Sequence, residues 1–199
     1  MDVTRLTGGG APTLGEPLPI ELANATYAVR GRPQDGLRTV EHFAAWLRDM
    51  RPRLAVPVAD ADLAAVTDAD LAAARELRGA IRELAHAAVT GDRPDPGALE
   101  VLNRLVRTAP RWRELRWDGD PHAEARSASR PVTAALAGIA EGAVELFSGP
   151  DRGELRACQG PGCVLYFLKD HPRREWCSAG CGNRARAARH YDRTRRSSG

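Results

Sequence analysis

Apolar side chains recur at intervals of three and four residues in four long segments of the chain, which is the pattern of an amphipathic helix. These segments are residues 39–50, 67–91, 95–109 and 131–148. Thr39 precedes the first segment as a helix N-cap, and Thr67 with Asp70 has the spacing of a capping box. Gly91 is a typical C-terminal stop. The sequence therefore predicts a largely helical protein.

The first 36 residues follow a different pattern. Residues 1–17 are rich in glycine and proline, which predicts a flexible leader. Leucine and isoleucine alternate with other residues over 18–22, which predicts a short strand running into residues 24–29. Turn-forming residues fill positions 31–36, so we expect a loop there.

A hairpin is predicted between the third and fourth helices. Residues 112–117 alternate in character and precede an Asp-Gly-Asp-Pro turn, so residues 122–128 are expected to pair back as a second strand. We expect the tryptophans of this N-terminal part to lie in the core; they are Trp46, Trp112 and Trp117. The body is thus a helical domain with a small β-sheet, an α+β arrangement.

Length and composition leave room for this body and one small module. The chain has 199 residues, of which 43% are hydrophobic. Gly149 and Pro150 break the last predicted helix, so we expect the leader at 1–17, the body at 18–150 and a C-terminal module at 151–199. No apolar run is long enough to span a membrane, and the start does not resemble a signal peptide. We expect a cytoplasmic protein.

Charge is distributed unevenly between these two parts. Residues 152–199 carry 11 basic and 4 acidic side chains, whereas residues 1–151 carry 18 basic and 22 acidic ones. The basic residues include a single lysine, and an arginine-rich composition can reflect a GC-rich genome. A basic module attached to a mildly acidic body nevertheless indicates a polyanion partner for the module.

The four cysteines of the chain all lie in this module. They form two close pairs, Cys158 with Cys163 and Cys177 with Cys181, separated by 13 residues. Zn²⁺ prefers four thiolates at tetrahedral corners, and each close pair can supply two of them. The spacing therefore predicts one structural zinc ion.

Other uses of the cysteines are alternatives. Disulfides suit an exported chain, whereas paired cysteines in a reducing cytoplasm more often hold a metal. A redox-active pair remains an alternative interpretation. A catalytic zinc usually has three protein ligands and one open position, whereas four thiolates can close the coordination sphere here.

The residues around the cysteines predict the order of elements in the module. Glycine and proline at 159–162 allow a tight knuckle, and residues 164–168 form an apolar strand. Residues 175–176 are expected to return as the second strand of a hairpin, and Ser178 caps a helix that carries Cys181 in its first turn. Knuckle, hairpin and helix in this order form a treble clef. Such a small module has too little core to fold without its metal.

Arginines cover a broad surface of that C-terminal helix. Arg186, Arg189, His190, Arg193 and Arg196 recur at helical spacing on one side. Since guanidinium groups suit both phosphate oxygens and guanine edges, this surface is the predicted nucleic-acid contact. The predicted contact residues are Arg173, Arg174, Arg184, Arg186, Arg189, Arg193 and Arg196.

The body offers no catalytic constellation, so we expect no enzymatic activity. No histidine shares a motif with a nucleophile, and the paired aspartates near helix starts suit the helix dipole. Asn24, Tyr27 and Arg30 are the best polar candidates for contact with a small-molecule effector.

Cys181-Gly182-Asn183-Arg184 matches the signature of the CGNR zinc-finger proteins, and residues 155–195 resemble that family throughout. Residues 18–30 and Phe43 to Leu47 are similar, more loosely, to the ABATE domain that usually precedes this finger. Such proteins are regarded as stress-induced bacterial transcription regulators. The resemblance implies a helical ABATE body, a treble-clef finger and a role on DNA.

Two functions follow as hypotheses. The first is a DNA-binding transcription regulator whose N-terminal domain senses an effector or forms a homodimer. The alternative is a zinc-stabilised module that docks on an acidic protein or on structured RNA.

Overall fold

The computed structural model describes residues 5, 6 and 10–197, with the side chains of residues 5, 6, 192 and 194–197 excepted. Its α-helices are α1 (Leu18–Ala23), α2 (Val40–Met50), α3 (Asp60–Ala64), α4 (Asp68–Thr90), α5 (Pro96–Val106), α6 (Pro131–Ser148) and α7 (Ala179–Ser197). Two short 3₁₀ helices are η1 (Arg51–Arg53) and η2 (Pro150–Glu154). Its strands are β1 (Arg5–Leu6), β2 (Pro12–Thr13), β3 (Thr26–Val29), β4 (Arg32–Asp35), β5 (Arg111–Arg116), β6 (His122–Ser127), β7 (Leu155–Ala157) and β8 (Tyr166–Leu168).

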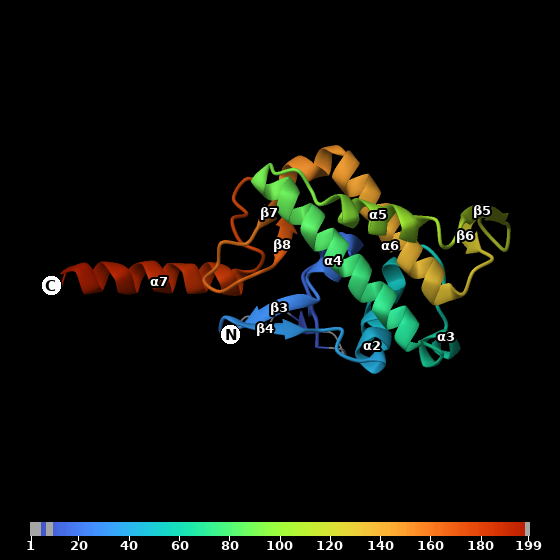
Figure 1. Ribbon diagram of the computed structural model, residues 1–199, viewed down its shortest axis with the longest axis horizontal. Coiled ribbons are helices and arrows are strands. Elements are labelled where there is room, and N and C mark those ends of the chain that lie inside the picture. Colours follow the sequence, from blue (N-terminus) through green and yellow to red (C-terminus); the bar gives the residue numbers. More distant parts are fainter. Residues whose placement is uncertain (1–4, 7–9, 198–199) are drawn as a thin grey trace.

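The longest body helix, α4, lies at the centre of a helical body and contacts α1, α2, α5 and α6 (Figure 1). Its apolar stripe, together with those of α2, α5 and α6, forms one core. Phe43, Trp46, Leu77 and Ile81 are completely buried there. The helical periodicity of the sequence therefore identified the faces that pack together, and the α+β, mainly helical fold class is confirmed.

The ends of these helices follow local side-chain chemistry. Thr67 Oγ1 accepts a hydrogen bond from Asp70 N at 3.2 Å, and Asp70 Oδ2 accepts one from Thr67 N at 2.9 Å, which closes the predicted capping box. Gly91 ends α4 in the left-handed region at φ 80°, and Thr39 caps α2. The predicted boundaries of both helices are thus confirmed.

Two predictions near the N-terminus are wrong. Residues 18–22, expected as a strand, form α1, since Pro17 precedes and Pro19 lies in a first helical turn where the fixed φ of proline suits a helix. Because α1 packs against both α4 and α6, its residues are buried on several sides. Its apolar residues therefore do not show the three- to four-residue spacing of a helix with one buried face. Residues 31–36, expected as a loop, contain β4, which pairs with β3 through a tight turn at Arg30 and Gly31, both at positive φ.

The hairpin of β5 and β6 forms as predicted, with Arg111 opposite Ser127 and Arg116 opposite His122. Of the tryptophans expected in the core, only Trp46 is buried. Trp112 and Trp117 are 47% and 74% exposed, since the hairpin projects beyond the helices that would cover it (Figure 1).

The C-terminal module packs closely against the body. Leu155 and Tyr166, from β7 and β8, share a buried cluster with Ile20 of α1, Ala85 of α4 and Leu146 of α6. Gly149 and Pro150 end α6, but the module that follows them shares an apolar cluster with the body. Within the module, α7 projects away from the body (Figure 1).

The segment before α1 also differs from the predicted flexible leader. Residues 1–4 and 7–9 lie outside the described residues, but Ala11 and Glu16 are buried and Leu14 packs against the cysteine cluster. In the part of the chain that the structure describes, no helix is both long and apolar enough to cross a membrane.

Candidate metal centre and basic helix

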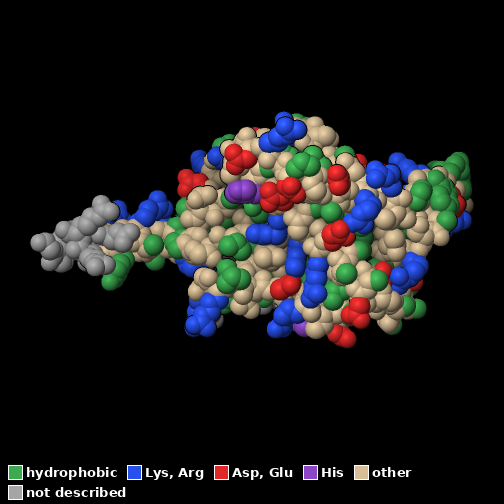
Figure 2. All heavy atoms as spheres, viewed as in Figure 1, with side chains coloured by type: hydrophobic (Ala, Val, Ile, Leu, Met, Phe, Trp, Pro, Cys, Tyr) green, Lys and Arg blue, Asp and Glu red, His purple; other side chains and the backbone are tan. Residues whose placement is uncertain are grey.

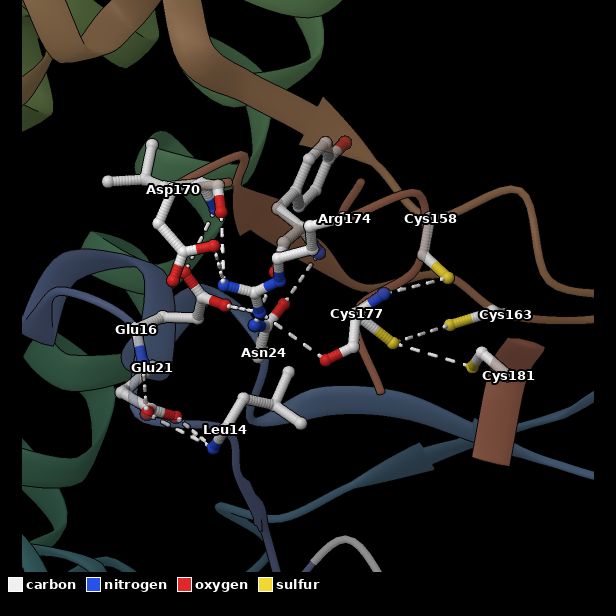
Figure 3. Close-up of polar contacts among 12 residues, drawn as sticks. Leu14, Glu16, Glu21, Asn24, Cys158, Cys163, Asp170, Arg174, Cys177 and Cys181 are labelled. Carbon is white, nitrogen blue, oxygen red and sulfur yellow. Dashed lines mark hydrogen bonds and ion pairs between the residues drawn. The ribbon is translucent and has the colours of Figure 1, made fainter. Parts of the chain in front are cut away.

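Four cysteine side chains meet at one point between the module's strands and the start of α7 (Figure 3). Their Sγ atoms all lie within 4.8 Å of one another; Cys163 and Cys177 are 3.8 Å apart, and Cys177 and Cys181 are 3.4 Å apart. Tetrahedral zinc with Zn–S bonds of about 2.3 Å requires sulfur–sulfur separations of about 3.8 Å. The donor set and its spacing therefore fit a closed four-thiolate zinc site.

Two backbone turns bring the cysteine pairs together. Cys158 follows β7 and donates its N–H to Leu165 O at 2.9 Å, while Cys163 N donates to Gly160 O at 2.9 Å, which closes the knuckle. Ser178 Oγ accepts from Cys181 N at 3.3 Å, as expected for the residue that caps α7. The knuckle and the helix start of the predicted treble clef are present.

The predicted hairpin after the knuckle is wrong. β8 pairs back with β7, with Leu155 opposite Leu168, and residues 175–176 form no strand. The reason is that both edges of β8 are occupied. β7 pairs along one edge, and the side chains of Asn24 and Glu16 bond the backbone of Tyr166 and Leu168 along the other. The chain instead reaches Cys177 through a loop.

Close approach explains why two of the module's glycines are needed. A Cβ on Gly160 would lie 2.9 Å from Cys181 Cβ and 3.2 Å from its sulfur. A Cβ on Gly182 would lie 2.9 Å from Cδ1 of Trp176, so the second residue of the Cys-Gly-Asn-Arg motif provides room for that ring. Both contacts are tighter than side chains tolerate without movement.

The crowded thiols favour a cation. Hydrogen bonds from Cys163 and Cys177 lower the pKa of Cys158, while hydrogen bonding to Cys158 raises the pKa of Cys163 and of Cys177. Zn²⁺ binds thiolates, so the cluster must lose its thiol protons when the metal binds. Metal binding at this site is therefore coupled to proton release and to folding. Arg184 Nη2 also lies 2.8 Å from Cys181 Sγ and supplies positive charge at the rim.

The predicted arginines fall into different environments. Arg186, Arg189 and Arg193 are exposed and border one hollow on α7. Arg173 is exposed on the loop before Cys177, whereas the side chain of Arg196 lies outside the described residues. Arg184 is directed at the cysteine cluster by its contact with Cys181, so its place is at the metal centre.

Arg174 is partly buried at the junction between the module and the body. Its guanidinium pairs with Glu16 and lies 3.3 Å from Asp170 Oδ1, and it donates to Leu168 O at 3.0 Å. The group also lies 5.0 Å from the centre of the Phe167 ring, within the range of a cation–π contact. With these contacts Arg174 ties the module to the segment before α1 (Figure 3), which the sequence did not indicate.

Buried polar residues of the body complete this junction. Asn24 Nδ2 donates to Tyr166 O at 2.9 Å and its Oδ1 accepts from Tyr166 N at 2.9 Å, so the predicted effector contact instead extends the edge of β8. Glu16 accepts from Leu168 N at 2.9 Å, and burial raises the pKa of Glu16 although the hydrogen bond and Arg174 oppose this. Glu21 is completely buried and accepts from Glu16 N at 2.8 Å.

The other predicted effector contacts lie on the β3–β4 hairpin. Tyr27 packs against the cysteine cluster, and Arg30 occupies the turn between β3 and β4. A cavity of about 430 Å³ lies elsewhere, between the N-terminal end of α1 and the face of α6 that carries Gly138 and Gly142. Arg53, Glu145 and mainly apolar atoms line it.

These observations define the class of the protein as a helical domain joined to a C-terminal four-cysteine zinc finger. The family described as “ABATE: Putative stress-induced transcription regulator” matches residues 16–150. The family described as “CGNR zinc finger” matches residues 154–194. The chain therefore belongs to the ABATE family and carries a CGNR zinc finger with one structural zinc ion. No curated protein matches the chain.

Proposed function

We propose that this protein is a transcription regulator that binds DNA through α7. The observation that supports this most directly is the set of exposed arginines Arg186, Arg189 and Arg193 on a helix that projects from the body (Figure 1). Because α7 extends away from the other elements, duplex DNA can approach these side chains without a clash with the helical core. Arginine forks bind phosphate oxygens and guanine edges in the major groove.

The zinc ion has a structural part in this proposal. Cys177 and Cys181 flank the N-terminus of α7, so a metal held by the cluster fixes the direction in which the helix leaves the protein. Zinc supplies folding free energy here, and Arg184 and the packed Trp176 hold the first turn in place. Arg173 adds a positive charge on the neighbouring loop.

The body has a separate role, which we propose to be self-association or effector sensing. The acidic balance of residues 1–151 and the lack of grouped catalytic side chains among the described residues support a non-enzymatic domain. The free cysteines of the adjoining module suit a reducing, cytoplasmic location. A two-fold dimer would present two copies of α7 to paired half-sites. The cavity beside α6 is where an effector would have room.

Fluorescence anisotropy with the full chain tests the proposal. Zinc-loaded protein should bind duplex DNA, and the triple variant Arg186→Ala, Arg189→Ala, Arg193→Ala should bind at least tenfold more weakly. A matched control removes three exposed arginines elsewhere, Arg32, Arg93 and Arg107, with the same change in net charge. Equal losses in both variants would contradict the assignment of α7.

The same assay separates the alternative function. If structured RNA or an acidic protein competes for α7 far better than duplex DNA, the module docks on that partner instead. Each variant is checked for folding by its zinc content and its helical circular dichroism. Both should match those of the wild type.

A further inference from the structure

The β5–β6 hairpin exposes more apolar surface than a solvated hairpin needs. Leu115 and Trp117 are 70% and 74% exposed, more than the other large apolar side chains among the described residues, and Trp112 of the same hairpin is 47% exposed. Figure 2 shows hydrophobic side chains gathered at the end of the molecule where Figure 1 places this hairpin. Grouped exposed apolar side chains of this kind mark interaction surfaces.

The body covers only the base of the hairpin's apolar face. Arg111 pairs with Glu141 of α6, and Ala125 on the neighbouring strand packs against buried alanines of the same helix. Alternate residues of a strand share a face, so Leu115 continues the face that begins at Arg111, and Trp117 follows at the tip. This outer part of the face extends beyond α6 and has no cover within the described residues.

The opposite face is polar and makes its contacts within the hairpin. Trp112 Nε1 donates to Glu114 at 2.9 Å, and Arg116 Nε donates to Glu124 at 3.2 Å. Arg126 Nη2 lies 2.9 Å from Glu124 as well. Charges of both signs therefore alternate across this face, and it suits water or a surface with the same alternation.

An open strand edge lies next to both faces. In the part of the chain that the structure describes, β5 pairs only with β6, so one edge of β5 has no strand partner. Such an edge presents backbone N–H and C=O groups that can pair with another strand. We propose that this edge pairs with β5 of a second copy of the chain, antiparallel, about a two-fold axis at Leu115. The inference rests on the self-association proposed above for the body.

The side chains of β5 are complementary to themselves in this register. In an antiparallel pair of strands, residues opposite each other point to the same face of the sheet. A two-fold axis that relates two identical strands must therefore lie between the two copies of one residue. With Leu115 on the axis, Leu115 meets Leu115, Glu114 meets Arg116 of the second copy twice, and Arg113 meets the ring of Trp117 twice. An axis at Arg113 or Glu114 would place like charges opposite each other.

The proposed dimer leaves the DNA-binding surface open. The hairpin and α7 lie at opposite ends of the molecule (Figure 1), so pairing through β5 places the two copies of α7 at the far ends of the dimer. Stable interfaces usually bury about 1,200–2,000 Å². Two paired hairpins are a small contact, so the dimer should depend on concentration and be strengthened by DNA that holds both copies.

Sedimentation equilibrium of the zinc-loaded full chain without DNA tests this surface. The wild type should show a monomer–dimer equilibrium, and Leu115→Lys should raise the dissociation constant at least tenfold. Leu99→Lys, which replaces an exposed leucine on α5, is the matched control and should change nothing. Glu114→Arg and Arg116→Glu should each weaken the dimer, because each places like charges opposite each other across the axis.

The possible outcomes distinguish self-association of the protein from the hairpin as its interface. A wild type that is monomeric at every concentration overturns self-association and this surface together. A dimer that persists in Leu115→Lys and in both charge reversals keeps self-association but refutes the hairpin as its interface. Neither result bears on DNA binding, which the α7 variants measure independently.

Discussion

Replacement of Arg174 tests whether this side chain is structural, as its contacts indicate, or a nucleic-acid contact, as its sequence context predicted. Arg174→Met removes the guanidinium that pairs with Glu16, donates to Leu168 O and lies over Phe167. Glu16 is only 2% exposed, so the substitution leaves a buried carboxylate without its cation.

The expected cost follows from this geometry. Removal of one partner from a buried ion pair costs about 3–5 kcal/mol, and the low end applies because the Arg174 side chain is 23% exposed. For a chain of this size each kcal/mol lowers the melting temperature by about 2–4 °C. Arg174→Met should therefore lower Tm by about 6–12 °C at neutral pH.

The loss should also depend on pH. Burial raises the pKa of Glu16 in the folded protein above its usual value of 4.5, so the ionised carboxylate destabilises the fold and protonation relieves this. Because the cation of Arg174 lowers this pKa, its removal raises the pKa further and enlarges the penalty above it. The Tm difference between wild type and variant should therefore shrink as the pH falls from about 7.5 toward about 5.

Differential scanning calorimetry with Arg173→Met as the matched control measures the effect. Arg173 is the exposed neighbour with the same charge, so its replacement should leave Tm within about 2 °C of the wild type. The pair Glu16→Gln and Arg174→Met should recover part of the stability, since glutamine still accepts from Leu168 N. An unchanged Tm together with weaker DNA binding in Arg174→Met would refute the structural role.

Three further predictions concern the module and its junction with the body. Cys177→Ser should bind less than half a zinc ion per chain by atomic emission and lose helical signal from α7, whereas the wild type should hold one ion. Gly182→Ala should destabilise the protein by about 1–3 kcal/mol in urea unfolding, because its Cβ would press on Trp176; an unchanged midpoint would contradict that contact. A chain that ends at Gly149 should aggregate in light scattering, since it would uncover Ile20 on α1; a monodisperse, fully folded product would show that the body does not need β7 and β8.

The parts of the fold that the sequence predicts well are those with a local cause. The helices with a capping box, such as α4, begin and end where Thr67 and Gly91 indicate, because these residues satisfy terminal backbone groups by themselves. The four cysteines were likewise found from spacing alone, since metal coordination restricts which residues can meet.

The parts that it predicts poorly depend on contacts between distant segments. The helix α1 alternates like a strand because neighbours bury it on several sides, and Trp117 is exposed because no helix reaches the hairpin tip. The pairing of Arg174 with Glu16 joins residues 158 positions apart, so no local pattern distinguishes this arginine from the exposed Arg173 beside it.

The central claim is that the arginines of α7 neutralise DNA phosphates. The salt dependence of the duplex dissociation constant tests this most directly, because each neutralised phosphate contributes about −0.9 to the slope of log affinity against log salt. The triple variant Arg186→Ala, Arg189→Ala, Arg193→Ala should retain its zinc and show a slope reduced by about two to three units relative to the wild type. A variant that keeps its zinc and binds duplex DNA with the wild-type slope would contradict the account.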